Sequence, residues 1–85
     1  MLNVEIAELV RPMVDDVSFG RDGRVNFRNY FSTAAGEEPH DVAWSEWLIL
    51  QENLKPHGLR AVDYWADNDT IGGVVENIPS EVSDG

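Results

Sequence analysis

The sequence predicts an α+β fold in which two helices pack on one face of a small antiparallel sheet, in the order α-β-β-α-β-β. Apolar residues recur at three- and four-residue spacing in two segments and alternate with polar residues in the others. Turn sequences at residues 21–23 and 67–69 divide the alternating segments into two hairpins. The length of 85 residues suits one domain, which we place at residues 1–78 and expect to be followed by a flexible acidic tail at residues 79–85.

The first helix is expected over residues 3–17. Asn3 is a suitable N-cap. Pro12 removes a helical hydrogen bond to Glu8, so we expect a kink or break near Arg11. The apolar face of this helix consists of Ile6, Leu9, Val10, Met13, Val14 and Val17.

The first hairpin is expected within residues 17–31, and its register depends on the length of its loop. A two-residue loop would place Phe19 opposite Asn26 and mix apolar with polar residues on one face. A three-residue loop, with Gly23 in the left-handed conformation, places Phe19 opposite Val25 and keeps one face apolar. The sequence therefore predicts the three-residue loop.

A second helix is expected after a polar connection at residues 32–40. Either Asp41 caps its start or Pro39 occupies its first turn, and Pro56 and Gly58 end it. The predicted buried stripe consists of Ala43, Trp47, Leu50 and Leu54, widened by Trp44 and Leu48.

The last two strands are expected at residues 59–66 and 70–78, which are rich in strand-forming residues. Residues 67–69 supply the turn between them. Gly72 and Gly73 lie inside the second of these strands. Consecutive glycines predict either a bulge or a weak edge strand there.

The net charge of −10 is distributed unevenly along the chain. Residues 21–36 sum to +2, whereas residues 37–85 sum to −9 and residues 1–20 to −3. A field of this sign repels nucleic acid and anionic membranes and attracts basic protein surfaces. The longest run of large apolar residues, at 47–50, is far too short to cross a membrane, and the N-terminus lacks the pattern of a signal peptide. We therefore expect a cytoplasmic protein of a bacterium or a phage-infected cell.

Catalytic, cofactor and metal sites are not expected. The absence of cysteine excludes disulfides, cysteine-ligated metals and a cysteine nucleophile. His40 and His57 lie at opposite ends of the second helix, too far apart to share a metal ion or a proton. Asp67 begins a stretch that faintly resembles a calcium loop, but Ile71 and Ile78 occupy positions that require oxygen ligands. The sequence thus favours a binding protein over an enzyme.

The predicted partner-binding surface is the outer face of the second helix, where two aliphatic residues are framed by carboxylates. It is extended by acidic residues of the second hairpin. These candidates are Glu38, Asp41, Val42, Ser45, Glu46, Ile49, Glu52, Asp63, Asp67 and Asp69. In size and charge, though not in any motif, the chain is similar to small phage-encoded inhibitors such as anti-CRISPR and DNA-mimic proteins. We therefore expect an inhibitor or modulator that docks on the basic surface of a nucleic-acid-processing protein.

Two alternative functions remain open. In the first, the chain is a structural or assembly subunit that forms a homo-oligomer through its sheet edges and the face around Val42 and Ile49. In the second, the basic and aromatic hairpin at residues 21–31 binds nucleic acid directly, although the net charge argues against this. The candidate residues for that second alternative are Arg21, Arg24, Arg28 and Tyr30.

Overall fold

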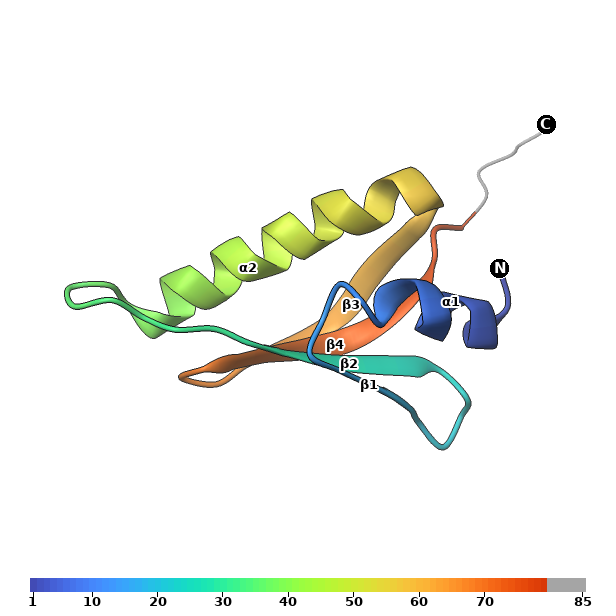
Figure 1. The fold of residues 1–85 in the computed structure, drawn as a ribbon, viewed down its shortest axis with the longest axis horizontal. Coiled ribbons are helices and arrows are strands. Elements are labelled where there is room, and N and C mark those ends of the chain that lie inside the picture. The colour runs from blue at the N-terminus through green and yellow to red at the C-terminus, as the bar shows by residue number, and fades with distance from the viewer. Residues whose placement is uncertain (80–85) are drawn as a thin grey trace.

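The computed structural model describes residues 1–79 and confirms the α+β class, with two α-helices, a short 3-10 helix and a four-stranded antiparallel sheet (Figure 1). In chain order the elements are α1 (Asn3–Val10), β1 (Asp16–Phe19), β2 (Val25–Tyr30), α2 (Pro39–Leu54), η1 (Lys55–His57), β3 (Leu59–Ala66) and β4 (Thr70–Asn77). The prediction of a tail at residues 79–85 lies, apart from Pro79, outside the described residues.

The strands lie in the order β1-β2-β4-β3, so β4 is a central strand and β1 and β3 form the two edges. Both β2 and β3 run antiparallel to β4 and are therefore parallel to one another. The long helix α2 connects these two parallel strands, and β4 fills the space between them. The prediction of a weak edge strand at residues 70–78 was wrong, because this strand has a neighbour on each side.

Helix α1 ends at Val10 with Arg11 as its C-cap, which confirms the predicted break near Arg11, but the helix does not continue to residue 17 as predicted. Pro12 has no N–H group to continue the helical ladder, and the Met13 N–H instead donates to the Val10 carbonyl at 2.8 Å, which tightens the last turn. The chain then reverses and enters β1 at Asp16.

The start of α1 also differs from the prediction. Leu2, not Asn3, is the N-cap residue, and its N–H donates to the Glu5 carboxylate at 2.8 Å. The Asn3 side chain instead donates from Nδ2 to the Gly23 carbonyl at 2.9 Å. This bond connects the first helix to the loop of the first hairpin.

The predicted register of the first hairpin is confirmed. Phe19 lies opposite Val25, and Gly23 has a φ of 82°, in the left-handed region that its loop position requires. The Gly20 N–H donates to the Arg24 carbonyl at 2.8 Å and closes the loop. The hairpin spans residues 16–30 and is therefore shifted by one residue from the predicted segment of 17–31, and Phe31 belongs to the connection.

Helix α2 begins at Pro39, so that the second of the two predicted starts is the observed one. Its N-cap residue is Glu38. The fixed φ of proline suits the first helical position, where its missing N–H would have no partner. After α2, η1 ends at His57, and its C-cap residue Gly58 has a φ of 74° that allows the chain to turn into β3.

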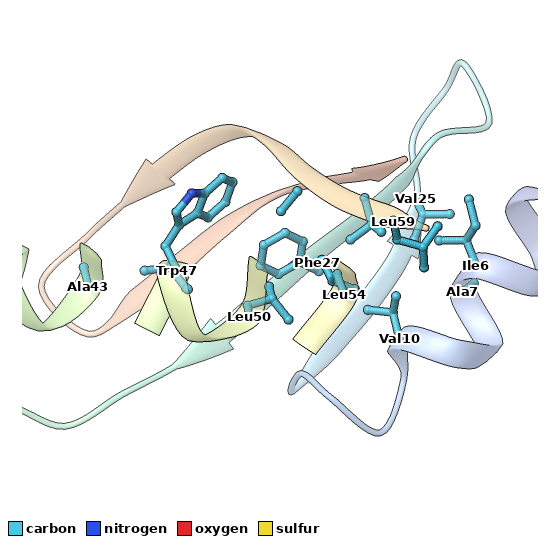
Figure 2. Packing of buried hydrophobic residues seen from close by; sticks show 13 residues of the cluster. Ile6, Ala7, Val10, Val25, Phe27, Ala43, Trp47, Leu50, Leu54 and Leu59 are labelled. Atoms are coloured by element: carbon cyan, nitrogen blue, oxygen red, sulfur yellow. The ribbon is translucent and has the colours of Figure 1, made fainter. Parts of the chain in front are cut away.

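One hydrophobic core lies between the helices and one face of the sheet (Figure 2). Ile6, Ala7 and Val10 from α1 meet Val25 and Leu59 at one end of this core. At the other end α2 places the Trp47 ring against Phe27, with ring centroids 6.1 Å apart. Burial of an aromatic or large aliphatic side chain contributes about 1.5–3 kcal/mol. The opposite face of the sheet carries no helix in residues 1–79.

The buried stripe of α2 is narrower than predicted. Trp44 and Leu48 are 48% and 46% exposed, so they do not widen the stripe into the core. Helix α2 packs over β3 and β4, at one side of the sheet. Because α2 lies above the edge of the sheet, only one of its flanks has sheet beneath it. Trp44 and Leu48 lie on the other flank, which extends past the edge strand β3.

A β-bulge interrupts β3 between Val62 and Trp65. Asp63 occupies it with a φ of 59°, an uncommon conformation that aspartate adopts more readily than most residues. Gly73 lies on the facing strand, where a Cβ atom would be 2.5 Å from the Val62 carbonyl oxygen. The two glycines therefore do mark an irregularity, but the extra residue belongs to the neighbouring strand.

No helix in residues 1–79 is both long enough and apolar enough to traverse a lipid bilayer.

Candidate functional site

The outward side of α2 carries the predicted partner-binding residues. We define the α2 outer face as the residues Glu38, Asp41, Val42, Ser45, Glu46, Ile49 and Glu52. Its two aliphatic residues differ in exposure, because Ile49 is 55% exposed and Val42 is half-buried. Residues 39–54 contain no lysine or arginine to offset these carboxylates. The His40 ring lies 3.9 Å from the Glu38 carboxylate and 3.7 Å from that of Asp41. The face is apolar at its centre and acidic around it.

A shallow hollow of about 310 Å³ lies at the N-terminal end of α2. The structure thus brings four of the predicted residues, Glu38, Asp41, Val42 and Ser45, to one concavity. Gly36 and Glu37 of the preceding connection complete its lining. The connection is held in place because the Glu37 carboxylate accepts a hydrogen bond from the Ala34 N–H at 2.7 Å.

A second exposed apolar group lies beside this face and was missed by the sequence reasoning. The Trp44 ring packs edge-on against Tyr64 of β3, with centroids 5.2 Å apart. Tyr64 also meets Trp47, with centroids 4.8 Å apart. Leu48 lies one helical turn beyond Trp44 and is exposed as well. The helical spacing could have indicated that Trp44 is exposed. Trp44 directly follows the buried Ala43, and adjacent helical residues point about 100° apart.

The three acidic residues predicted in the second hairpin do not lie together. Asp67 and Asp69 belong to the turn between β3 and β4, at the same end of the molecule as the start of α2 (Figure 1). Asp63 lies in the bulge, and its carboxylate is 3.5 Å from Nη1 of Arg24. Asp63 is therefore part of the uncovered face of the sheet and does not extend the α2 outer face.

The candidate nucleic-acid-binding residues of the first hairpin also do not form one group. Arg21 lies in the exposed loop between β1 and β2. Arg28 points to the uncovered face of the sheet, where its Nη2 is 3.5 Å from Asp16. Tyr30 is on the same side of β2, and its hydroxyl is 3.5 Å from the same carboxylate. Arg28 and Tyr30 therefore face an acidic neighbour in the folded chain.

Arg24 and Arg60 share Glu76 on the same face. The Arg60 Nε donates to Glu76 Oε2 at 2.7 Å, and Arg24 Nη2 lies 3.3 Å from Oε1. The hydrogen bond and positive charge of Arg60, assisted by Arg24, hold the pKa of the Glu76 carboxyl below its ordinary value. The Arg24 guanidinium is thus paired within the fold, with the carboxylates of Glu76 and Asp63.

Among residues 1–79 there is no group of three or more histidines or carboxylates arranged to hold a metal ion. Comparisons with protein-family models, curated proteins and solved structures gave no match.

Proposed function

We propose that the chain is a small, non-enzymatic inhibitor or modulator that uses the α2 outer face to bind the basic surface of a nucleic-acid-processing protein. The observation that carries this proposal is the exposure of Ile49 among carboxylates on a helix without lysine or arginine. An exposed apolar centre with a charged rim is the usual anatomy of a protein-binding patch.

The chemistry of the rim supports a basic partner. Glu38, Asp41 and Glu52 present carboxylates, and the net charge of −10 adds a long-range field of the same sign. Such a field accelerates encounter with a cationic surface and opposes encounter with DNA or RNA. A carboxylate rim can take the place of backbone phosphates in a nucleic-acid channel, so we expect DNA and this protein to compete for one surface.

The test is capture of proteins from lysate on the immobilised 85-residue chain at about 50 mM and about 500 mM salt, conditions that differ strongly in screening. We expect basic nucleic-acid-binding proteins at low salt, their release at high salt, and their displacement by excess duplex DNA. Ile49→Asp should remove at least nine-tenths of the captured protein, because it places a charge at the centre of the contact.

Val4→Asp is the matched control, since Val4 is an exposed aliphatic residue of the other helix. It should leave the capture unchanged. Equal loss in both variants would contradict the assignment of the α2 outer face. Capture that ignores both salt and DNA would contradict phosphate mimicry while leaving protein binding through Ile49 intact.

A further inference from the structure

The uncovered face of the sheet contains a hollow of about 420 Å³ that the proposed function does not use. We call it the sheet hollow. All four strands contribute to it, and Val74 of the central strand β4 lies among its lining residues. The polar and aromatic side chains around it are Asp16, Ser18, Asn26, Arg28, Asp63 and Trp65.

Trp65 forms an aromatic wall of the sheet hollow because Gly72 makes room for it. The two residues are paired across β3 and β4, and a Cβ atom on Gly72 would overlap the six-membered ring and Nε1 of Trp65. The indole therefore lies directly against the strand at this position. It remains 41% exposed, so part of its surface is open to a ligand. A glycine beneath an indole thus gives the sheet a flat aromatic surface.

The charges around the sheet hollow favour a cation. Asp16 and Asp63 contribute two carboxylates from the opposite edge strands to the lining, which includes one guanidinium, that of Arg28. Arg24 lies outside the lining, next to Asp63. Asp16 approaches Arg28 only to 3.5 Å, and Asp63 approaches Arg24 to the same distance. Both carboxylates are more than half exposed and keep oxygen lone pairs for a further donor. The net charge of −10 adds to their attraction for a positive group.

We infer that the sheet hollow binds the guanidinium group of an arginine side chain presented by a peptide or protein. A planar guanidinium can stack on the indole of Trp65 and donate to the carboxylate of Asp63 at the same time. An ammonium lacks the flat surface, and the phosphate group of a nucleotide would lie near two carboxylates but only one arginine of the lining. This site lies on the face of the sheet opposite α2, so it is independent of the proposed function.

The test is an NMR titration of the full 85-residue chain with the peptide acetyl-Gly-Arg-Gly-amide. Its citrulline counterpart has the same shape without the charge, and uridine monophosphate serves as the anionic probe. We expect the arginine peptide to shift the Trp65 indole N–H and the backbone amides of residues 16–18, 26–28 and 62–65. The citrulline peptide and the nucleotide should leave them in place.

Two substitutions give opposite expected results. Asp63→Asn keeps a residue that tolerates the left-handed backbone and should weaken binding roughly three- to fivefold through loss of a charge. Arg28→Gln removes the competing cation and should tighten binding roughly two- to threefold. Asp67→Asn is the matched control, because it makes the same charge change in the turn, outside the sheet hollow.

The sign of the Arg28→Gln effect decides between ligand classes. Weaker binding in this variant, or saturable binding of uridine monophosphate that depends on Arg28, would overturn the inference and assign the hollow to an anion. Equal shifts with the citrulline peptide, or an unperturbed Trp65 indole at saturating arginine peptide, would also overturn it. Because α2 is not involved, Ile49→Asp should leave this titration unchanged even where it abolishes partner capture.

Discussion

The Glu76 carboxylate forms ion pairs with an arginine from each of the two hairpins. It lies on the central strand β4, and its Oε2 accepts a hydrogen bond from the Arg60 Nε of the neighbouring strand β3 at 2.7 Å. Arg24, at the end of the first hairpin loop, approaches its other carboxylate oxygen at 3.3 Å. The pair is partly exposed, with Arg60 at 43% and Glu76 at 31%, so solvent screens a large part of the attraction.

We expect Glu76→Gln to lower the free energy of unfolding by about 1 kcal/mol near neutral pH, the upper end for a screened ion pair. The folded protein holds the Glu76 pKa below its ordinary value. This stabilisation is therefore complete above the pKa of the unfolded chain and is lost as pH falls through the folded pKa. Urea unfolding of both proteins at about pH 7 and about pH 3 should show the difference shrinking in acid.

Glu8→Gln is the control for this pH series, because Glu8 lies 3.9 Å from Arg11 on the exposed side of α1. It should change stability little at either pH. A Glu76→Gln effect that stays the same in acid would contradict the role of the ionised carboxylate.

The glycines of β4 show why some residues were misread from the sequence. Gly72 and Gly73 were interpreted through their own strand, as a bulge or a weak edge. In the structure they make room for Trp65 of β3 and Trp47 of α2, both of which would collide with or crowd a Cβ atom. Contacts between elements distant in sequence leave no local pattern, so the Trp65 surface and the sheet hollow could not be predicted.

Helix α2 protects the edge strand β3. The side-chain amide of Gln51 donates to the Ala61 carbonyl at 2.8 Å and accepts from the Ala61 N–H at 2.9 Å. One glutamine thereby takes the place of a neighbouring strand at this residue. An unprotected edge offers its backbone groups to other chains, so this contact also blocks one route to aggregation.

We expect Gln51→Leu to destabilise the fold by about 2 kcal/mol, because it leaves the partly buried N–H and carbonyl of Ala61 without a partner. Amide hydrogen exchange at Ala61 should accelerate, and urea unfolding should report the lost stability. Asn53→Leu makes a similar change at an exposed position of α2 and should leave Ala61 exchange unchanged. Equal exchange rates at Ala61 in both variants would show that Gln51 does not protect the edge.

Elements whose signals are local were predicted well. The stripe of α2 and the register of the first hairpin follow from helical spacing and from the conformation of Gly23. The absence of a helix after Pro12 and the exposure of Trp44 depend instead on where the chain turns and on which strands a helix covers. The predicted binding residues of α2 share one face, whereas Asp63 was separated from them by the bulge in β3.

Charge is divided between the faces of the molecule and not only along the chain. Arg24 of the +2 segment meets Asp63 and Glu76 of the acidic segment, and Arg28 meets Asp16 of residues 1–20. Across the whole uncovered face of the sheet the arginines and carboxylates balance, although the lining of the sheet hollow has two carboxylates for one arginine. The α2 outer face keeps its carboxylates without arginine or lysine partners from its own helix. This division favours a cationic partner over a second copy at the α2 outer face.

We therefore expect a monomer by light scattering at tens of micromolar and low salt, because two copies of charge −10 repel each other when screening is weak. Raising the salt to about 500 mM should permit at most weak association through Ile49, which Ile49→Asp would remove. Val4→Asp is again the control for an added charge. A defined oligomer at low salt that Ile49→Asp dissociates and Val4→Asp preserves would favour the assembly-subunit alternative, because a second copy would then occupy the face assigned to a basic partner.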